Sequence, residues 1–351
     1  SGMTGTAVAS RNEFRRSYGL DVVAVLPSNT LRRIDFPARV YPTRQDKLLS
    51  LVDDVKFRQK VGQPVLIGTL SVDQSEEISR LLERNGVEHR LLNAVNTSEE
   101  AEVVRSAGSF GAVTVATNMA GRGTDIILEP RLATRVTQRY TSLVEEFLSD
   151  GVEKVALGCP TREEADMLES ALAASASLSV TRVRNGSKTE VIAARKSAGT
   201  GVGREVSLGF GAGLHVIGTE MNESRRTDDQ LRGRGGRQGE FGSSRSMLSL
   251  EDRPLVFHSA TRSTLSREAK RDPLSRTFFE GRRTDARVGS VQSAIEMQDE
   301  AVRSAAWEYG QVIERQTTSF YGARWELVQS TSFHATCEAF TRARARRFVD
   351  Q

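Results

Sequence analysis

The sequence predicts an α/β fold, a parallel sheet with flanking helices that is followed by a helical segment. Between Pro64 and Ile127, short apolar runs alternate with helical patterns, which is typical of parallel strands joined by right-handed crossovers. Apolar runs at Leu214–Gly218 and Ser246–Leu250 predict further strands of this sheet. From about Val291 to Gln351, apolar residues recur at helical spacing.

The expected elements follow from apolar periodicity and from the turn residues between them. In chain order, the sequence predicts a strand over Asp21–Leu26, a helix over about Gln45–Val61, a strand over Pro64–Thr69, a helix opened by Ser75–Glu77 and running over Ile78–Glu83, and a strand over Val113–Ala116. Residues Glu251–Gly289 are charged and irregular, so they are expected to form a linker.

Length, composition and charge limit the kinds of protein that this chain can be. The 351 residues suggest about two domains, and no stretch of about 18 apolar residues predicts a membrane-spanning helix. Two cysteines and four scattered histidines predict neither a disulfide framework nor a metal centre. The net charge is only +4. The basic tail Arg342–Arg347 is interpreted as a solvated helix end, and an anionic lipid surface stays open as its partner.

The segment after Asp229 contains the pattern Q-x-x-G-R-x-x-R, with arginines at Arg234 and Arg237. Two guanidinium groups three residues apart, on a turn loosened by glycines, can reach the charge that develops on a transferring γ-phosphoryl group. Arginine suits this role because its planar fork binds phosphate oxygens in pairs. The alternative interpretation is an Arg/Gly-rich surface loop.

A second motif follows the predicted strand Val113–Ala116. It is a polar, glycine-rich loop that contains Gly121, Gly123, Thr124 and Asp125. Open α/β sheets bind ligands at the carboxyl edge of the strands. The glycines would let the backbone approach a ligand closely, and Asp125 could accept hydrogen bonds from a ribose hydroxyl.

Together with three further segments, these motifs resemble the SecA family of protein-translocating ATPases. The segments are Met3–Ala7, Gly213–Ser244 with its Glu223–Gln230 signature, and Val291–Leu327, which matches the family's long scaffold helix. The resemblance covers roughly residues 1–128 and 213–327. It implies a RecA-like fold of the P-loop NTPase and helicase type, followed by an α-helical scaffold segment.

The resemblance also implies the site and its ligands. ATP would lie between two RecA-like domains, with Arg234 and Arg237 as catalytic arginine fingers. Nucleotide-binding residues would be Gly123, Thr124, Asp125 and Gln230. The chain contains no G-x-x-x-x-G-K-[ST]. It is therefore expected to correspond to the second motor domain plus the start of the scaffold, to be inactive alone, and to leave the Mg²⁺ ligands to a missing N-terminal half.

The family's partners follow in the same way. The resemblance implies the missing first motor domain, the Sec channel and an unfolded preprotein as partners, and no nucleic acid. The location would be the cytoplasm and the periphery of the inner membrane, or the plastid stroma and thylakoid membrane in a plastid-bearing organism. Two alternatives stay open, namely a degenerate, non-catalytic SecA-like binding or regulatory module and, less favoured, a nucleic-acid helicase fragment.

The expected domain organisation has four parts. They are a connector over 1–20, a motor domain over 21–250 with an insertion at about 129–212, a linker over 251–290 and a helical scaffold segment over 291–351. Within the insertion, Val155–Gly158 repeats the pattern of Val65–Gly68 at an offset of 90. This repeat predicts either a decayed duplication or a chance match within a lineage-specific insertion. The glycine-rich stretch Ala193–Gly213 is expected to be a flexible connector.

Three positions depart from the family pattern. Met221-Asn222 stands where the family has Arg-His, Gly235 where it has Ser, and Glu240-Phe241 where it has Asp-Pro. The change at Met221-Asn222 is expected to weaken polar contacts between the motor domains and to leave the fingers intact.

Overall fold

The computed structural model describes residues 2–92, 100–117, 123–185, 188–196, 204–258, 261–266, 278–329 and 332–349. These residues fall into two compact units, which are described separately. The first unit comprises residues 1–10 and 23–296, and the second comprises residues 11–22 and 297–351.

The first unit is built on a seven-stranded sheet in which every strand pair is parallel. Its order is β1-β11-β10-β3-β5-β4, and β2 pairs with the second half of β11. The strands are β1 (Arg32–Asp35), β2 (Arg39–Tyr41), β3 (Val65–Thr69), β4 (Arg90–Leu92), β5 (Val113–Thr117), β10 (Leu214–Gly218) and β11 (Phe241–Ser249). The parallel α/β fold predicted from the sequence is confirmed.

Helices cover both faces of this sheet. On one face, helices α2 (Arg44–Lys60) and α3 (Val72–Arg84) pack on strand residues such as Val65, Ile67 and Val115. The opposite face carries α4 (Glu100–Ser106) and α7 (Arg225–Arg232), which contact residues such as Leu66 and Ala116. Because side chains alternate along a strand, continuous apolar runs supply both cores.

Two local expectations need correction. No strand forms over Asp21–Leu26, and the first strand is β1 instead. Val23 and Val25 lie 81% and 88% exposed, so this apolar run is extended without burying its side chains. Helix α3 begins at Val72 rather than at Ser75, because the Ser71 side chain accepts a hydrogen bond from the Gln74 backbone and caps the helix.

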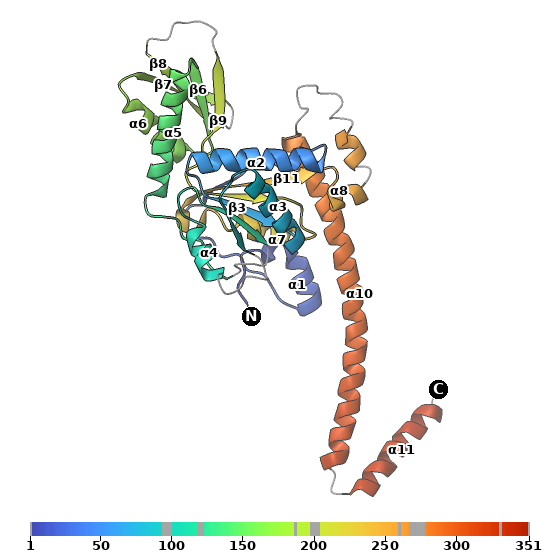
Figure 1. Ribbon diagram of the computed structural model, residues 1–351. Helices are drawn as coiled ribbons and strands as arrows, with labels where there is room; N and C mark the ends of the chain where they lie inside the picture. The colour runs from blue at the N-terminus through green and yellow to red at the C-terminus, as the bar shows by residue number, and fades with distance from the viewer. Residues whose placement is uncertain are drawn as a thin grey trace. The chain divides into compact units, whose positions relative to one another are not determined.

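The expected insertion forms a second sheet, with the order β7-β8-β6-β9. Among the described residues, none of its four strands pairs with the seven-stranded sheet, and Figure 1 shows β6 to β9 as a separate sheet with α5 and α6. In chain order its elements are α5 (Leu132–Ser149), β6 (Lys154–Cys159), α6 (Arg162–Ala173), β7 (Leu178–Asn185), β8 (Lys188–Arg195) and β9 (Glu205–Gly209).

The insertion shares an apolar core with helix α2 and its C-terminal end. Tyr140, Leu157 and Leu168 pack in one cluster with Val61 at the end of α2, and Phe57 and Phe110 lie against that cluster. The expectation of a flexible connector over Ala193–Gly213 is wrong at both ends, because β8 continues to Arg195 and β9 begins at Glu205. Residues 197–203, the centre of that stretch, lie outside the described residues.

The two segments related by the internal repeat share a strand-to-helix turn but not a topology. Ser71 caps α3, and Thr161 caps α6, each three residues after the glycine that ends the repeated pattern. However, β7 and β8 form an antiparallel hairpin, whereas the first sheet is parallel. The choice between duplication and chance therefore stays open.

After β11, the chain is more helical than the sequence predicts. Helix α8 spans Arg253–Phe257, residues 261–266 are helical, and α10 begins at Arg282 rather than at about Val291. Helix α10 ends at Gln329. Val291 of α10 packs with Leu248 in the core of the first unit, and this contact orders a segment that looks irregular in sequence.

In the second unit, the N-terminal helix α1 (Arg11–Tyr18) pairs with the distal part of α10. Arg303 forms a bidentate ion pair with Glu13, and Tyr18 packs against Trp307. A short 3₁₀ helix, η1 (Ala7–Ser10), precedes α1, and α11 (Phe333–Val349) carries the basic tail. Within the described ranges, every helix is too short or too polar to cross a membrane.

Candidate functional site

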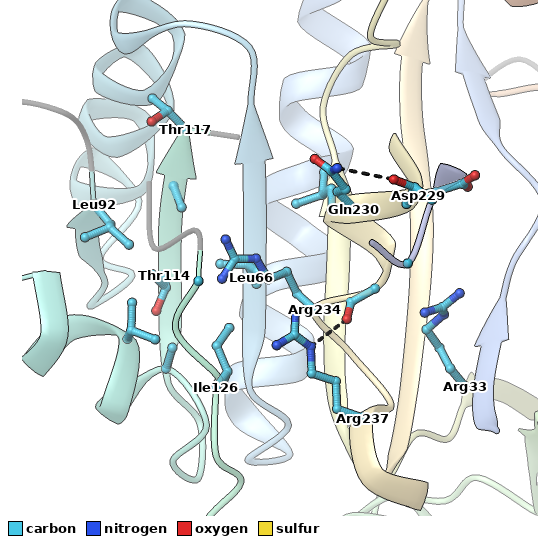
Figure 2. Close-up of a pocket in the computed structure, with 18 of the residues that line it drawn as sticks. Arg33, Leu66, Leu92, Thr114, Thr117, Ile126, Asp229, Gln230, Arg234 and Arg237 are labelled. Atoms are coloured by element: carbon cyan, nitrogen blue, oxygen red, sulfur yellow. Dashed lines mark hydrogen bonds between the residues drawn. The ribbon is translucent and has the colours of Figure 1, made fainter. Parts of the chain in front are cut away.

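A cavity of about 620 Å³ lies on the α4 and α7 face of the first unit. Leu66 of β3 and Thr114 of β5 form part of its wall, and Thr117 lines it at the end of β5 (Figure 2). The sequence places the ligand at the carboxyl edge of the strands. In the structure the cavity extends from that edge along the face of the sheet.

Both predicted finger arginines line this cavity, and both contact the glycine-rich loop after β5. Arg234 donates from Nη1 to the backbone oxygen of Thr124 at 3.1 Å. Arg237 forms an ion pair with the Asp125 carboxylate and donates from Nε to the backbone oxygen of Gly233 at 2.8 Å. Figure 2 shows both side chains reaching from the loop after α7 into the cavity. The structure therefore brings the two motifs together.

Of the predicted nucleotide-binding residues, Thr124 and Asp125 do not line the cavity themselves, and they contact the lining residues Arg234 and Arg237. Gly123 and Gln230 line the cavity. The Gln230 amide donates to the Thr6 hydroxyl at 3.3 Å, and Arg226 donates to the same hydroxyl at 3.1 Å. Residues Thr4–Thr6 of the expected connector therefore form part of the wall, which the sequence does not predict. Gly121 lies outside the described residues.

The loop after β5 is held against the sheet by close backbone packing. Ile126 is buried in the core with Leu66, and the Glu129 carboxylate accepts a hydrogen bond from the Phe110 backbone at 2.9 Å. A β-carbon at Gly108 would overlap the backbone oxygen of Ile127. These contacts return the chain across the sheet face and place Asp125 opposite the finger loop.

The finger loop is clamped rather than loosened by its glycines. Gly236 has φ +68°, and a β-carbon there would lie 2.5 Å from the β-carbon of Arg33. A β-carbon at Gly242 would lie 2.5 Å from the Gly236 nitrogen. Gln238, at φ 53°, is one of two non-glycine residues with positive φ among the described residues, and such strain often marks functional loops. The glycines therefore fix the position of Arg237.

Arg33 is a third arginine at the cavity, and the sequence reasoning misses it. It lies on β1, and its Nε donates to the Asp35 carboxylate at 2.8 Å. Burial would raise the pKa of Asp35, but hydrogen bonds from Arg33 and Ser244 lower it overall. Asp35 therefore remains an ionised partner that orients Arg33. No local pattern marks Arg33, because its role depends on the pairing of β1 with β11.

The charges of the cavity suit the phosphates of a nucleotide better than a metal ion. Three arginines line it, and burial lowers the pKa of Arg237, a shift that a bound anion would oppose. The carboxylate of Asp229, which lines the cavity, is paired with Arg232, and the carboxylate of Asp125 is paired with the lining residue Arg237. In the part of the chain that the structure describes, no three potential ligand side chains gather as a metal site. The residues present fit ATP and do not fit a Mg²⁺ centre.

The structure also gives a position for Asn222, at one of the departures from the family pattern. Asn222 is buried and donates hydrogen bonds to Asp228 of α7 within the first unit. From the sequence, the change at Met221-Asn222 is expected to weaken contacts with another motor domain. What the structure shows is an internal contact that holds α7.

Comparisons with known proteins place the chain. The family model described as the SecA P-loop domain matches residues 30–269, which is more than half of the chain. The protein translocase subunit SecA of a Geobacter species is 35% identical over 97% of this chain and 37% of its own length. The same subunit of an Arthrobacter species is 37% identical over 97% of this chain and 34% of its own length.

A solved structure of the Escherichia coli DEAD-box protein SrmB, bound to the regulator RraA, covers 66% of this chain and 84% of its own. Its identity is 13% and its TM-score is 0.34, so it carries no weight here. The chain spans little more than a third of the length of the curated relatives described above. The family match and the sequence identity establish that this chain belongs to the SecA family.

Proposed function

We propose that this chain supplies the arginine-finger half of the ATP site in a motor that moves preproteins through the Sec channel. The observation that carries the proposal is that Gln230, Arg234 and Arg237 line one cavity, and that Arg237 pairs there with Asp125, which lies 112 positions away in the sequence. The relatives are named as protein translocase subunits, which supports the translocation role. The Sec channel, an unfolded preprotein and an anionic lipid surface are the proposed partners.

The contacts suggest how the site works. Asp125 and a phosphate group compete for the Arg237 guanidinium, because both are oxyanions that accept paired hydrogen bonds. When a γ-phosphate reaches the cavity, Arg237 can exchange the carboxylate for the phosphate. Asp125 is then free to accept a hydrogen bond from a ribose hydroxyl. Arg234, held on the Thr124 backbone, would stay beside the phosphates.

The fingers contribute charge that is needed most in the transition state. Their guanidinium groups would stabilise negative charge on the transferring γ-phosphoryl group, whereas other residues, including those of the P-loop half, would supply most of the binding energy for the ground-state nucleotide. Mg²⁺, when bound with ATP, would neutralise phosphate charge, and its ligands would come from the P-loop half of the motor. Loss of the γ-phosphate would release Arg237 to Asp125 and loosen the contact between the motor domains.

The test is Arg237→Ala in an intact protein that carries both halves of the ATP site. We expect the turnover number to fall by about 10³ or more, with nucleotide affinity nearly unchanged. Arg80→Ala, which removes an exposed arginine paired with Glu76, is the control. If turnover stays within about threefold of the wild type, Arg237 is not a finger.

The 351-residue chain by itself gives a second test. Its sequence contains no P-loop lysine motif, so we expect it to hydrolyse no ATP above background. Phosphate release would be measured with malachite green. Turnover by the chain that disappears on Arg234→Ala would show a complete site and contradict the proposal.

A further inference from the structure

A polar cluster is buried between the finger helix α7 and the first turns of α10. Asn222, Asp228 and Gln292 are 7%, 8% and 7% exposed. The Asp228 carboxylate accepts from the backbone and side-chain nitrogens of Asn222 at one oxygen and from the Gln292 amide at the other. Gln292 also donates to the Asn222 backbone oxygen at 3.3 Å. Both oxygens of the buried carboxylate are thereby satisfied.

A second contact from α10 caps the start of α7. The Ser224 side chain, at the N-cap position of α7, makes no capping hydrogen bond. Instead, the Glu296 carboxylate of α10 accepts a hydrogen bond from the Arg225 backbone nitrogen. A carboxylate is favourable at this end of a helix because the free backbone N–H groups carry partial positive charge. Gln292 and Glu296 are one helical turn apart, so a single face of α10 makes both contacts.

The first turns of α10 are themselves anchored to the motor domain. Val291 packs with Met221 and Leu248, and Asp285 accepts from the Ala38 backbone at 2.8 Å. A cavity of about 260 Å³ lies beside the cluster and is lined by both helices. The cavity leaves space next to α7 on this side. Helix α7 can therefore shift without a clash there, while the hydrogen bonds tie it to α10.

Breaking the hydrogen bonds between α7 and α10 would be energetically costly. Burial raises the pKa of Asp228, whereas the hydrogen bonds from Asn222 and Gln292 lower it and so favour the charged form. If α10 moved and α7 stayed, the Asp228 oxygen that faces Gln292 would lose its donor inside the protein, and an unsatisfied buried acceptor is strongly unfavourable. Helix α7 should therefore follow α10. Since α7 ends at Arg232, the movement would reach Arg234 directly.

We propose that Gln292 and Glu296 are positioning residues, through which the first turns of α10 set the position of α7 and of the arginine fingers that follow it. This inference rests on the proposed function. It assigns to two α10 residues a role in turnover, although neither lines the nucleotide cavity.

The decisive experiment exchanges the carboxylate and the amide between positions 228 and 292. Gln292→Glu places a carboxylate against Asp228. In the double variant D228N/Q292E, the new amide can still accept from Asn222 and can donate to the new carboxylate. The hydrogen bond between positions 228 and 292 is thereby restored with its direction reversed, and only the 3.3 Å contact from residue 292 to the Asn222 backbone oxygen is lost. Gln298→Glu makes the same chemical change at an exposed position of the same helix and is the control. Glu296→Ala is a milder second variant, in case Gln292→Glu fails to fold.

Two measurements distinguish the attachment of α7 to α10 from its effect on turnover, namely hydrogen exchange and steady-state kinetics. In the 351-residue chain, hydrogen exchange at the start of α7 should accelerate by about tenfold or more in Gln292→Glu and Glu296→Ala. It should return toward the wild-type rate in the double variant and stay unchanged in Gln298→Glu. In the intact motor, kcat should fall by about tenfold in the same variants, with KM for ATP within about threefold, and the double variant should recover.

Each contrary result has a distinct meaning. Unchanged exchange at α7, or a loss that the double variant does not rescue, would overturn the attachment. Accelerated exchange with normal kcat, in a motor that Arg237→Ala still inactivates, would overturn the positioning role alone. Turnover that survives Arg237→Ala would contradict the proposed function itself. It would also exclude a role in turnover for the contact between α7 and α10.

Discussion

Asp125 and Arg237 form an ion pair that joins the loop after β5 to the loop after α7. The two residues are 112 positions apart in the sequence. Arg237 lines the cavity and is also held locally, by a hydrogen bond from its Nε to the Gly233 backbone oxygen. The pair makes the two motifs parts of one site.

Asp125→Asn should weaken the recognition of the ribose in the intact motor. The reason is that an ionised carboxylate is a stronger acceptor for a hydroxyl than an amide oxygen. We expect the preference for ATP over 2′- or 3′-deoxy analogues to shrink by about tenfold, as judged from competition binding. Asp53→Asn, which changes an exposed carboxylate on α2 that does not line the cavity, is the control. A preference that is unchanged for both analogues would exclude Asp125 as the ribose ligand.

The two neighbouring glycines of the finger loop should respond differently to substitution. Gly236→Ala forces an alanine into a left-handed conformation against the β-carbon of Arg33, so it should cost about 2 kcal/mol or more. Gly235→Ser restores the residue usual in the family. There, a β-carbon would lie 3.3 Å from the Leu214 oxygen, a tight contact but not an overlap, so a small effect is expected. Urea unfolding measures both, and equal losses would show that the loop is not clamped at Gly236.

Asp54 should contribute stability that is lost in acid. Burial alone would raise its pKa, but the charge of Arg58 and a hydrogen bond from that side chain lower it from 3.8 to about 2. A depressed carboxyl pKa stabilises the fold above the unfolded-state value, and this contribution disappears as the pH falls through about 2. At about 1.4 kcal/mol per pH unit, it amounts to about 2 kcal/mol at neutral pH.

Asp54→Asn should therefore destabilise the chain most near neutral pH. The difference from the wild type, measured by urea unfolding, should shrink as the pH falls from about 4 toward 2. Asp53→Asn changes an exposed carboxylate one residue earlier on the same helix and is the matched control. A difference that does not vary with pH would mean that Asp54 acts by packing and not by charge.

The insertion should be removable without loss of the sheet. We predict that replacing Arg131–Gly209 with a short Gly/Ser linker keeps cooperative unfolding, because the strands of the insertion pair only with one another in the described parts of the chain. The unfolding free energy should nevertheless fall, since Val61 and Phe57 lose their apolar cover. If the deletion variant is insoluble because Phe57 and Phe110 are newly exposed, polar substitutions at these two residues should restore its solubility. A variant without a near-UV circular dichroism signal would place the insertion within the folding core.

The sequence by itself determined the parallel strands that are buried on both faces. Val65–Thr69, Val113–Thr117 and Leu214–Gly218 are mostly apolar and almost fully buried, as is typical of strands in the centre of a sheet that is covered on both faces. It also singled out Arg234, Arg237 and Asp125, which the structure brings into contact, while their role in catalysis stays a prediction. These inferences depend on information within a short stretch of chain.

Tertiary structure alone decided what depends on distant neighbours. The run Asp21–Leu26 has strand-like composition but forms no strand, because a strand requires a paired edge and not only a propensity. Arg33 joins the cavity through the pairing of β1 with β11, and Gly236 must be glycine because Arg33 lies against it. Asn222, Asp228 and Gln292 come together from three segments. Burial and hydrogen-bond satisfaction act between residues that only the folded chain brings into contact, so no local pattern in the sequence records them.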